Sequence, residues 1–379
     1  MSDHPDIENL PDVLEGIPVR ESIRQLFRDP ANGTPDNISK AGCLALALKS
    51  NEAGCVGKGY VVWNAWREVF SSQTNDLSRK NCANFEDVNS SNELVGEISF
   101  RSFHFGRRTS FKRATFQEKT SFIDANFGDF SSFHQAKFYK DSLFRSSAKN
   151  NDGSFLRIRF SYCRFEGKAD FSNRLFLGSS SFKGTNFGVA PIFHGCELHQ
   201  DTSFEGAEFP KPTGSEQAAR AYRTLKLAFS NQQAIREEQR FFKLEMEEET
   251  LRETGLKRLL FKAYKTFSDF GFSITRPLTY GGLGVLGLTA AYGILSWLGQ
   301  CGLSMQACHF APERLEFSLL QTLPLPGLDK LSEAASKVFW PEGSWWSLGL
   351  SVLVIFQKIL SLATLFLVGL ALRNLFKLK

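Results

Sequence analysis

The sequence is poor in the residue groups on which catalysis and metal binding depend. Its 7 cysteines are scattered without a CxxC pair, which argues against a zinc site or a dithiol redox site. Its 6 histidines form no HExxH pattern and lie beside no nucleophile motif, and no glycine-rich phosphate loop occurs. We therefore expect no catalytic residue, no cofactor and no metal site.

An excess of one charge is also lacking. The chain carries 45 Lys and Arg against 40 Asp and Glu, and the net charge of +5 is spread along it. A nucleic-acid partner usually requires a concentrated basic face, so none is expected. The polar, acidic residues 1–40 contain no recognisable secretory signal, which favours a cytoplasmic N-terminal part with reduced thiols.

Phenylalanine is in excess, with 37 residues against 7 Tyr and 6 Trp. From Phe100 to Phe209 large apolar residues return at steps of five and six, a unit of about eleven residues. Such steps fall on different faces of a helix, and an odd step leaves the face of a straight strand. The chain must therefore turn a corner between rings, and repeated corners build a solenoid. We expect its core to contain Phe105, Phe111, Phe116, Phe122, Phe127, Phe133, Phe138, Phe144, Phe160, Phe165, Phe171, Phe182, Phe187, Phe204 and Phe209.

A small residue stands two positions before most of these rings. In an extended segment both residues point to the same side, so the small residue should lie inside next to the ring. Examples are Thr109, Ala114, Thr120, Ala125, Ser131, Ala136, Cys163, Ala169, Ser180, Thr185, Thr202 and Ala207.

This spacing resembles that of the pentapeptide-repeat proteins, in which each five-residue unit forms one side of a four-sided right-handed β-helix. The resemblance covers residues 85–210 and departs from the family in the sixth residue of every second unit. We interpret that residue as a corner bulge, which gives about 22 residues per coil. Lys149–Gly153 interrupts the repeat and is expected to leave it as a loop. Some relatives imitate DNA with an acidic rod, but here acidic and basic residues of the repeat nearly balance.

One cluster within the repeat, His194, Cys196 and His199, could suggest a metal site. In a solenoid the two histidines project from adjacent sides while the cysteine points inward. The three side chains should therefore not converge on one ion, and Cys196 is interpreted as a small core residue.

The regions on either side of the repeat are expected to be helical caps. Residues 1–84 form a small N-terminal region, in which Trp63, Trp66 and Phe70 share one helix face. We interpret this face as the cover of the open solenoid end rather than as a ligand site, and similar Trp-Asn-x-Trp segments precede the repeats of many relatives. Residues 211–275 form a helical connector and cap, in which a break near Ser230 produces a helix pair.

Residues 276–379 are expected to contain two transmembrane helices, at about 278–299 and 346–372, joined by an extracytoplasmic loop. Basic residues flank both outer ends, which predicts two cytoplasmic termini in an inner membrane. Trp345 and Trp346 should lie at the opposite interface, and Cys301 and Cys308 could pair if that side is oxidising. The ending QKILSLATLFLVGLALRNLFKLK resembles the last helix of membrane-associated pentapeptide-repeat proteins from bacteria.

Two features of this region leave its role open. Lys358 lies near the middle of the second span, where it makes a helix contact or an oligomer contact, or lines a pore. The apolar residues 317–328 have the length of a re-entrant or interfacial segment. The first functional hypothesis is a non-catalytic, membrane-anchored scaffold that presents the β-helix to an unidentified protein partner. The alternative is an oligomeric, channel-like or membrane-effector protein, with the lipid bilayer and further copies of the chain as partners and the β-helix as cytoplasmic sensor.

Overall fold

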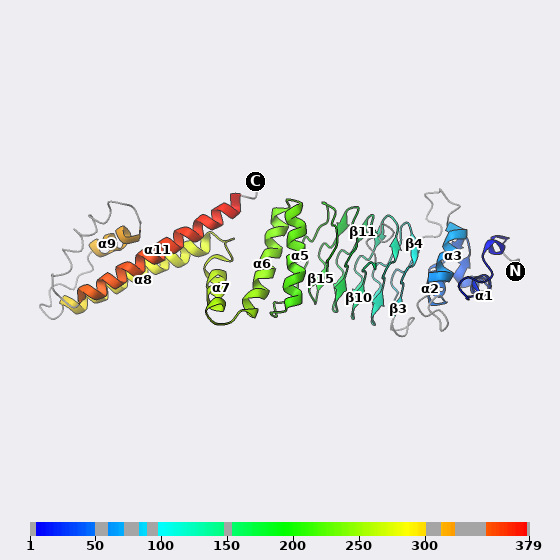
Figure 1. The fold of residues 1–379 in the computed structure, drawn as a ribbon, viewed down its shortest axis with the longest axis horizontal. Coiled ribbons are helices and arrows are strands. Elements are labelled where there is room, and N and C mark those ends of the chain that lie inside the picture. The colour runs from blue at the N-terminus through cyan, green and yellow to red at the C-terminus, as the bar shows by residue number, and fades with distance from the viewer. Residues whose placement is uncertain are drawn as a thin grey trace. The chain divides into compact units, whose positions relative to one another are not determined.

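The computed structural model describes residues 5–49, 60–71, 83–88, 98–147, 154–300, 312–322 and 346–376. The chain divides after Arg252 into two compact units (Figure 1). The predicted connector, residues 211–275, is therefore shared between the units. The physical reason is that its first two helices cover the β-helix, whereas its third packs with the helices of the second unit.

The first unit begins with short elements around a small apolar core. They are η1 (Pro5–Asn9), α1 (Val19–Leu26), η2 (Pro30–Asn32), the antiparallel pair β1 (Gly33–Thr34) and β2 (Asn37–Ile38), α2 (Lys40–Lys49) and α3 (Tyr60–Ser71). Val19, Ile23, Leu46 and Trp66 are fully buried.

The repeat folds into short parallel strands on four sides of a coil, consistent with a β-helix (Figure 1). One side holds β3 (Ile98–Ser99), β6 (Thr120–Ser121), β10 (Ser142–Leu143) and β13 (Ala169–Asp170), and the next holds β4 (His104–Gly106) and β7 (Asn126–Phe127). The third side holds β8 (Ser131–Ser132), β11 (Ile158–Arg159) and β14 (Ser180–Ser181). The fourth holds β5 (Thr115–Phe116), β9 (Lys137–Phe138), β12 (Arg164–Phe165) and β15 (Asn186–Phe187).

The strand register fixes the length of a coil. Ile98 pairs with Thr120 and Thr120 with Ser142, so paired residues differ by 22 in number, as predicted. Ser142 pairs with Ala169, a difference of 27, so this coil contains five additional residues. The predicted loop, Lys149–Gly153, falls in this coil and lies outside the described residues.

The inward rings stack in columns along the coil axis. Phe111 lies 4.7 Å from Phe133 with an interplanar angle of 3°, and Phe133 lies 5.4 Å from Phe122 of the neighbouring column with an angle of 84°. The rings thus combine parallel stacking along the axis with edge-to-face contact across it, both favourable geometries for aromatic pairs. Of the fifteen predicted core phenylalanines, fourteen are buried, and Phe209 is half-buried beneath the C-terminal cap.

Helix α3 covers the N-terminal end of the coil. The Trp63 indole N–H donates to the His104 carbonyl at 2.9 Å, and the Trp63 ring stacks on Phe103 at 5.5 Å. Asn64 donates to the Ser102 carbonyl, and the Arg67 guanidinium donates to the Phe105 carbonyl. The helix therefore covers the first rings and also binds carbonyl groups that no preceding coil contacts within the described residues.

The other end of the coil is covered by the antiparallel pair α5 (Glu216–Asn231) and α6 (Ile235–Arg252), which are separated at the predicted break. Phe241 meets Phe204 at 5.6 Å, and Tyr222 meets Phe209 at 5.8 Å. The Arg240 guanidinium donates to the Phe204 carbonyl at 2.7 Å and to the Ala207 carbonyl. Both ends of the β-helix are thus closed by an aromatic helix face and an arginine.

The second unit contains α7 (Gly255–Ser268), α8 (Thr275–Gln300), α9 (Pro312–Thr322) and α11 (Trp346–Phe376). Glycines of α8 allow close contact with α11, since a Cβ at Gly281 would meet Thr364 and one at Gly284 would meet Leu360. Among the described residues, one helix is long and apolar enough to span a membrane, Ser351–Phe376.

The prediction of two spans is therefore supported for the second helix only. Residues 278–299 do form a helix, α8, but Ser351–Phe376 is the one candidate span among the described residues. α8 is also less uniformly apolar than α11, because four of the seven residues from Gly281 to Gly287 are glycines, which contribute little apolar surface.

Candidate functional site

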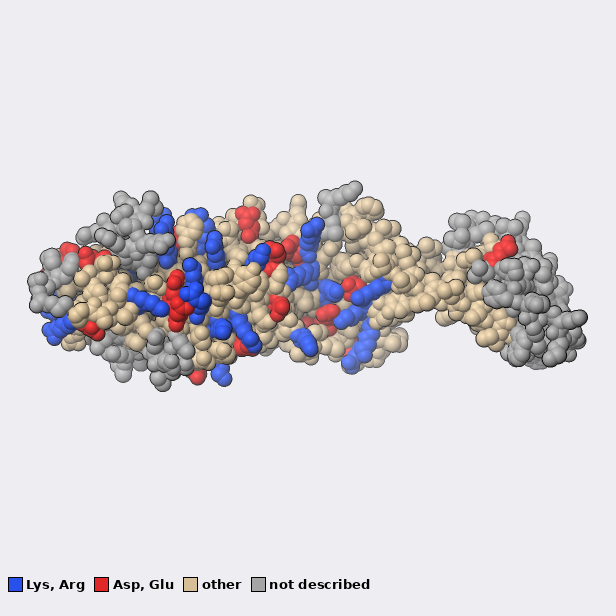
Figure 2. Space-filling view, turned by 180° about the vertical axis from the view of Figure 1, so that it is seen from behind, with Lys and Arg blue, Asp and Glu red and all other residues tan. Residues whose placement is uncertain are grey.

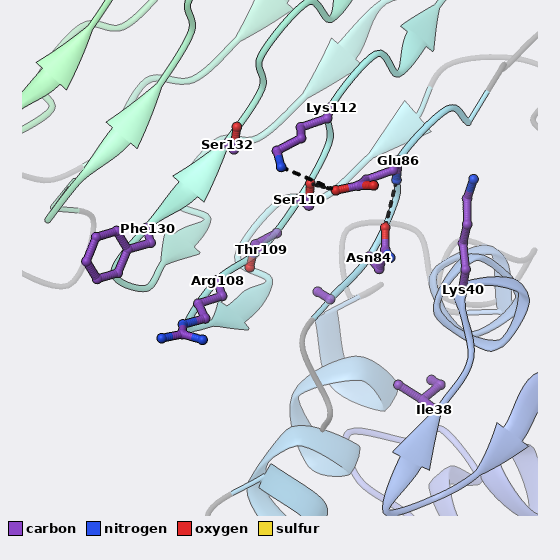
Figure 3. A pocket seen from close by; sticks show the side chains of 11 residues that line it. Ile38, Lys40, Asn84, Glu86, Arg108, Thr109, Ser110, Lys112, Phe130 and Ser132 are labelled. Carbon is purple, nitrogen blue, oxygen red and sulfur yellow. Dashed lines mark hydrogen bonds and ion pairs between the residues drawn. The ribbon is translucent and has the colours of Figure 1, made fainter. Parts of the chain in front are cut away.

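A groove at the N-terminal end of the β-helix is a candidate site built from described residues (Figure 3). Its volume of about 680 Å³ falls within the range of small-ligand and peptide pockets. Ile38 of β2 and Lys40 of α2 line one wall, and the segment from Ala83 to Glu86 lines the floor. The other wall belongs to the first two coils and consists of Arg108, Thr109, Ser110, Lys112, Phe130 and Ser132.

The floor of the groove is fixed by the start of the β-helix. Asn84 forms a parallel bridge with Ser110, and the Phe85 amide donates to the Ser110 carbonyl at 2.7 Å. Phe85 itself stacks on Phe111 at 4.7 Å, which places its neighbours Asn84 and Glu86 on the outer surface. The floor of the groove is therefore held in place by the pairing and ring stacking of the first coil.

The groove is predominantly cationic. Its lining contains Lys40, Arg108 and Lys112 against the single carboxylate of Glu86. Glu86 accepts a hydrogen bond from the Ser110 hydroxyl at 2.6 Å, and the Lys112 ammonium lies 3.8 Å from it. Within the described parts of the chain, neither Lys40 nor Arg108 makes an ion pair. Two of the three cations are therefore available to a carboxylate supplied from outside.

An aromatic side chain stands at the far edge of the groove. Phe130 is 49% exposed and has a φ of 65°, a left-handed conformation that is unfavourable for a bulky residue. The Arg157 guanidinium lies 3.7 Å from its ring centre and also binds Asp129 on the same corner. The hydrogen bond from Arg157 is the main reason why the pKa of Asp129 is below its usual value. The same left-handed conformation recurs at other corners of the coil, such as Arg113 and Tyr162, so it belongs to the coil geometry. The exposure of the Phe130 ring is what suits this position to contact with a partner.

The chemistry of the lining suits binding. Its polar groups are ammonium, guanidinium, hydroxyl, amide and carboxylate groups, and the Ser110 hydroxyl donates to the Glu86 carboxylate. Cationic groups beside an apolar ring suit a segment that brings acidic and apolar side chains together.

A buried arginine occupies an inward position in the middle of the coil. Arg174 is fully buried two positions before Phe176, where other units have a small residue. Its guanidinium donates to the carbonyls of Phe144, Ala125 and Phe122, the last two at 2.9 Å. Burial lowers the pKa of Arg174 to about 10, and the nearby Asp124 opposes this effect.

Arg174 is needed where the long coil interrupts the ladder. In regular coils the corresponding carbonyl accepts from the strand above, as Cys163 does from the Asn186 amide at 2.8 Å. Among the described residues the only donor to Ala125 is the guanidinium. Arg174 is therefore a structural residue that replaces ladder hydrogen bonds rather than a ligand-binding one.

The residues of the sequence cluster near His194 have separate roles. His194 is exposed, and the Cys196 thiol donates to the Phe171 carbonyl at 3.0 Å. His199 accepts a hydrogen bond from the Asp201 amide at 3.1 Å. In the described ranges no group of three or more His, Cys, Asp and Glu could hold a metal ion.

The second unit has a polar cluster of its own. Gln357 of α11 is fully buried and accepts a hydrogen bond from the Tyr292 hydroxyl of α8 at 2.7 Å. Its amide donates to the Ser318 carbonyl of α9 at 2.6 Å and to the Thr322 hydroxyl at 2.9 Å. One glutamine therefore joins three helices. The predicted re-entrant segment, residues 317–328, is described only in its first part, which belongs to α9.

The other residues predicted for this unit are placed less completely. Lys358 is exposed on α11 beside the buried Gln357. Trp346 is the first residue of α11. Trp345, Cys301 and Cys308 lie outside the described residues, so the predicted interface position and the possible disulfide remain predictions.

The repeat pattern alone does not reveal the groove, Arg174 or Gln357. Arg108 and Lys112 lie at outward-facing positions of the repeat, and the sequence does not distinguish one outward-facing position from another. Two signals were nevertheless present. Phe130 is a phenylalanine outside the five-and-six pattern, and Arg174 is a charged residue at a position otherwise taken by small ones.

A comparison with protein families supports the repeat. The family described as Pentapeptide repeats (9 copies) matches residues 160–209. Comparisons with curated proteins and with solved structures found no match. The matched residues form the C-terminal coils, and strands before residue 148 continue the matched strands in three of the four parallel sheets.

Proposed function

We propose that this pentapeptide-repeat protein is a non-catalytic scaffold, anchored in a membrane by its second unit, that binds a protein partner along the sides of its β-helix. The observation that carries the proposal is the cationic groove lined by Lys40, Arg108 and Lys112. Its size suits a short extended segment of a partner, and its charge suits acidic side chains. The exposed Phe130 adds an apolar contact of the kind that dominates binding energy at interfaces.

Membrane attachment is supported by the surface of α11. Ile355, Ile359, Leu362 and Phe366 are each more than half exposed along this helix. A continuous apolar surface of this kind is normally covered by lipid or protein. Because α8 packs along α11, insertion of α11 would place α8 in the same bilayer, so the chain would cross it twice. Arg276 and Arg373 would then mark the cytoplasmic face of the inner membrane.

The groove can be tested by site-specific cross-linking in cells. The photoreactive benzoylphenylalanine replaces Phe130, a conservative aromatic change, and separately replaces Tyr139, which is 42% exposed on another corner. We expect a discrete cross-linked species from Phe130 and none from Tyr139. Reversing the charge of the groove by Lys40→Glu and Arg108→Glu should abolish the cross-link from Phe130. The control substitutions Lys137→Glu and Lys140→Glu, outside the groove, should leave this cross-link unchanged. Equal cross-linking from both positions, or no effect of the reversal, would contradict the proposal.

A second function, an oligomeric channel-like or membrane-effector protein, is favoured by the polar cluster around Gln357. It holds the short helix α9 against two long helices, an arrangement that can place a pore-lining segment. Two long helices cannot enclose a pore, so several copies are required. Full-length protein in liposomes should then conduct ions, and Gln357→Leu should reduce the conductance. A monomer without conductance would exclude this function while leaving the scaffold proposal intact.

A further inference from the structure

Helix α7 has an apolar stripe that the protein does not cover within the described part of the second unit. Leu256, Leu259 and Leu260 are 71%, 63% and 60% exposed, and Phe267 is 42% exposed. With Ala263, these residues follow the three- and four-residue spacing of a single helix face. Phe267 also meets Tyr280 at 5.2 Å, so the stripe continues onto the first turns of α8.

The stripe is not the face by which α7 packs. Tyr264 and the fully buried Ser268 lie on a different side, where the Tyr264 hydroxyl donates to the Phe270 carbonyl at 2.9 Å. The Tyr264 ring also contacts Phe270 at 5.7 Å. The helix therefore satisfies its packing with one face and leaves a second apolar face to another environment.

The third face of α7 is basic. The helix contains Lys257, Arg258, Lys262 and Lys265 and no acidic residue. Arg258, Lys262 and Lys265 point away from the leucines, as a helical projection of the sequence shows. Lys and Arg side chains gather over this helix (Figure 2). An exposed apolar face beside a basic one is the pattern of a helix that lies in a membrane interface.

The position of α7 within its unit agrees with that pattern. The Asn374 amide near the end of α11 donates to the Gly271 carbonyl at 2.9 Å, and Arg276 donates to the Lys265 carbonyl at 3.1 Å. The C-terminal end of α7 is therefore tied to the end of α11 at which the apolar span gives way to Arg373 (Figure 1). This is the level of a lipid headgroup when α11 lies in a bilayer.

We propose that α7 is an interfacial helix that inserts Leu256, Leu259 and Leu260 among the acyl chains and binds anionic phospholipid headgroups through its basic face. The inference rests on the proposed membrane attachment of α11 and adds to it a preference for anionic lipid. A basic residue near an anionic surface contributes roughly a fivefold increase in partitioning.

Hydrogen–deuterium exchange of the full-length protein tests this inference. The protein is placed in nanodiscs of phosphatidylcholine, alone or mixed with phosphatidylglycerol. We expect α11 to be protected in both lipids and α7 to exchange at least tenfold more slowly with phosphatidylglycerol. Changing the four basic residues of α7 to Gln should abolish that difference. The matched control Lys137→Gln, Lys140→Gln, Arg145→Gln and Arg159→Gln removes four exposed cations from the β-helix and should preserve it.

A second variant isolates the apolar stripe. Leu256→Ser, Leu259→Ser and Leu260→Ser change only exposed side chains, and the protection of α7 should then fall in both lipids. Equal exchange of α7 in the two lipids, with α11 protected, would overturn the inference and leave the membrane anchor standing. An unprotected α11 would overturn both. Protection of α7 that follows protein concentration in detergent, and not lipid charge, would assign the stripe to a second copy and overturn the inference.

Discussion

Replacing Arg174 by methionine should destabilise the middle of the β-helix by about 3 kcal/mol. Methionine fills most of the volume of the arginine side chain but donates no hydrogen bond. The carbonyls of Ala125 and Phe144 then lose the guanidinium, their only donor among the described residues. The carbonyl of Phe122 is affected less, because the Ala125 amide also donates to it at 3.2 Å.

The magnitude follows from two opposing effects. Each buried carbonyl without a donor costs about 1–3 kcal/mol, so two of them cost about 2–6 kcal/mol. Removing the arginine also removes the cost of burying a cation, which offsets part of the loss. Arg174→Lys should fall between the wild type and Arg174→Met, because one ammonium group cannot reach three carbonyls arranged around a planar guanidinium.

Hydrogen exchange of the full-length protein measures this effect in place. The amides of Phe122 and Phe144 each donate across the ladder at 2.7 Å, so they exchange only when the coil opens. A loss of 3 kcal/mol corresponds to roughly hundredfold faster exchange. Arg159→Met, at an exposed position of β11, serves as the control and should leave both rates unchanged. Exchange in Arg174→Met within threefold of the wild type would refute the role assigned to the guanidinium.

Three further predictions concern residues inside or beside the β-helix. Phe133→Ala should cost about 3–5 kcal/mol in opening free energy, measured by the same exchange, and an unchanged rate would contradict its stacked position. Burial raises the pKa of Asp124, whereas hydrogen bonds from Ser147 and Ser146 lower it. Together the hydrogen bonds outweigh burial, so the pKa of Asp124 is below its usual value. The ionised Asp124 side chain should therefore stabilise the fold above pH about 4, and this stabilisation should be lost as the pH falls through the lower, folded-state pKa. In Asp124→Asn, hydrogen exchange should no longer show this loss of stability at acid pH. Burial raises the pKa values of the Cys163 and Cys196 thiols, that of Cys196 to about 12, so mass spectrometry should detect their alkylation only after unfolding, and rapid labelling of folded protein would contradict their inward placement.

The regular part of the fold could be predicted because few geometries satisfy it. Rings at alternating steps of five and six residues can share one interior only if the chain turns a corner after each, and this condition also sets the coil length. The observed pairing of Ile98, Thr120 and Ser142 follows from it. The face formed by Trp63 and Trp66 could be predicted for the same reason, since an open coil end exposes rings and strand edges that need a cover.

The irregular parts could not be predicted from periodicity. A five-residue insertion can leave a coil in many ways, and only the three-dimensional arrangement shows that Arg174 takes over hydrogen bonds at that level. The groove depends on β2 and α2 lying beside the first coils, a contact between segments about 70 residues apart for which repeats carry no information. Hydropathy placed two apolar segments, but it could not show that the glycines of the first let α8 approach α11 closely.

The closure of both coil ends determines where a partner can bind. Repeat proteins can add further units at an open end, because a terminal coil presents unpaired strands and exposed rings. Here Arg67 binds the carbonyl of Phe105 at one end and Arg240 binds that of Phe204 at the other, and aromatic helix faces cover the rings at both. Neither end can therefore extend the ladder with another chain. The sides remain, and along them Lys, Arg, Asp and Glu alternate (Figure 2), so a large uniformly charged surface is absent from the visible face. Recognition then has to depend on a local feature. In the groove beside Phe130, two cations that make no ion pair with described residues lie near an exposed ring, above a floor that pairs with the next coil.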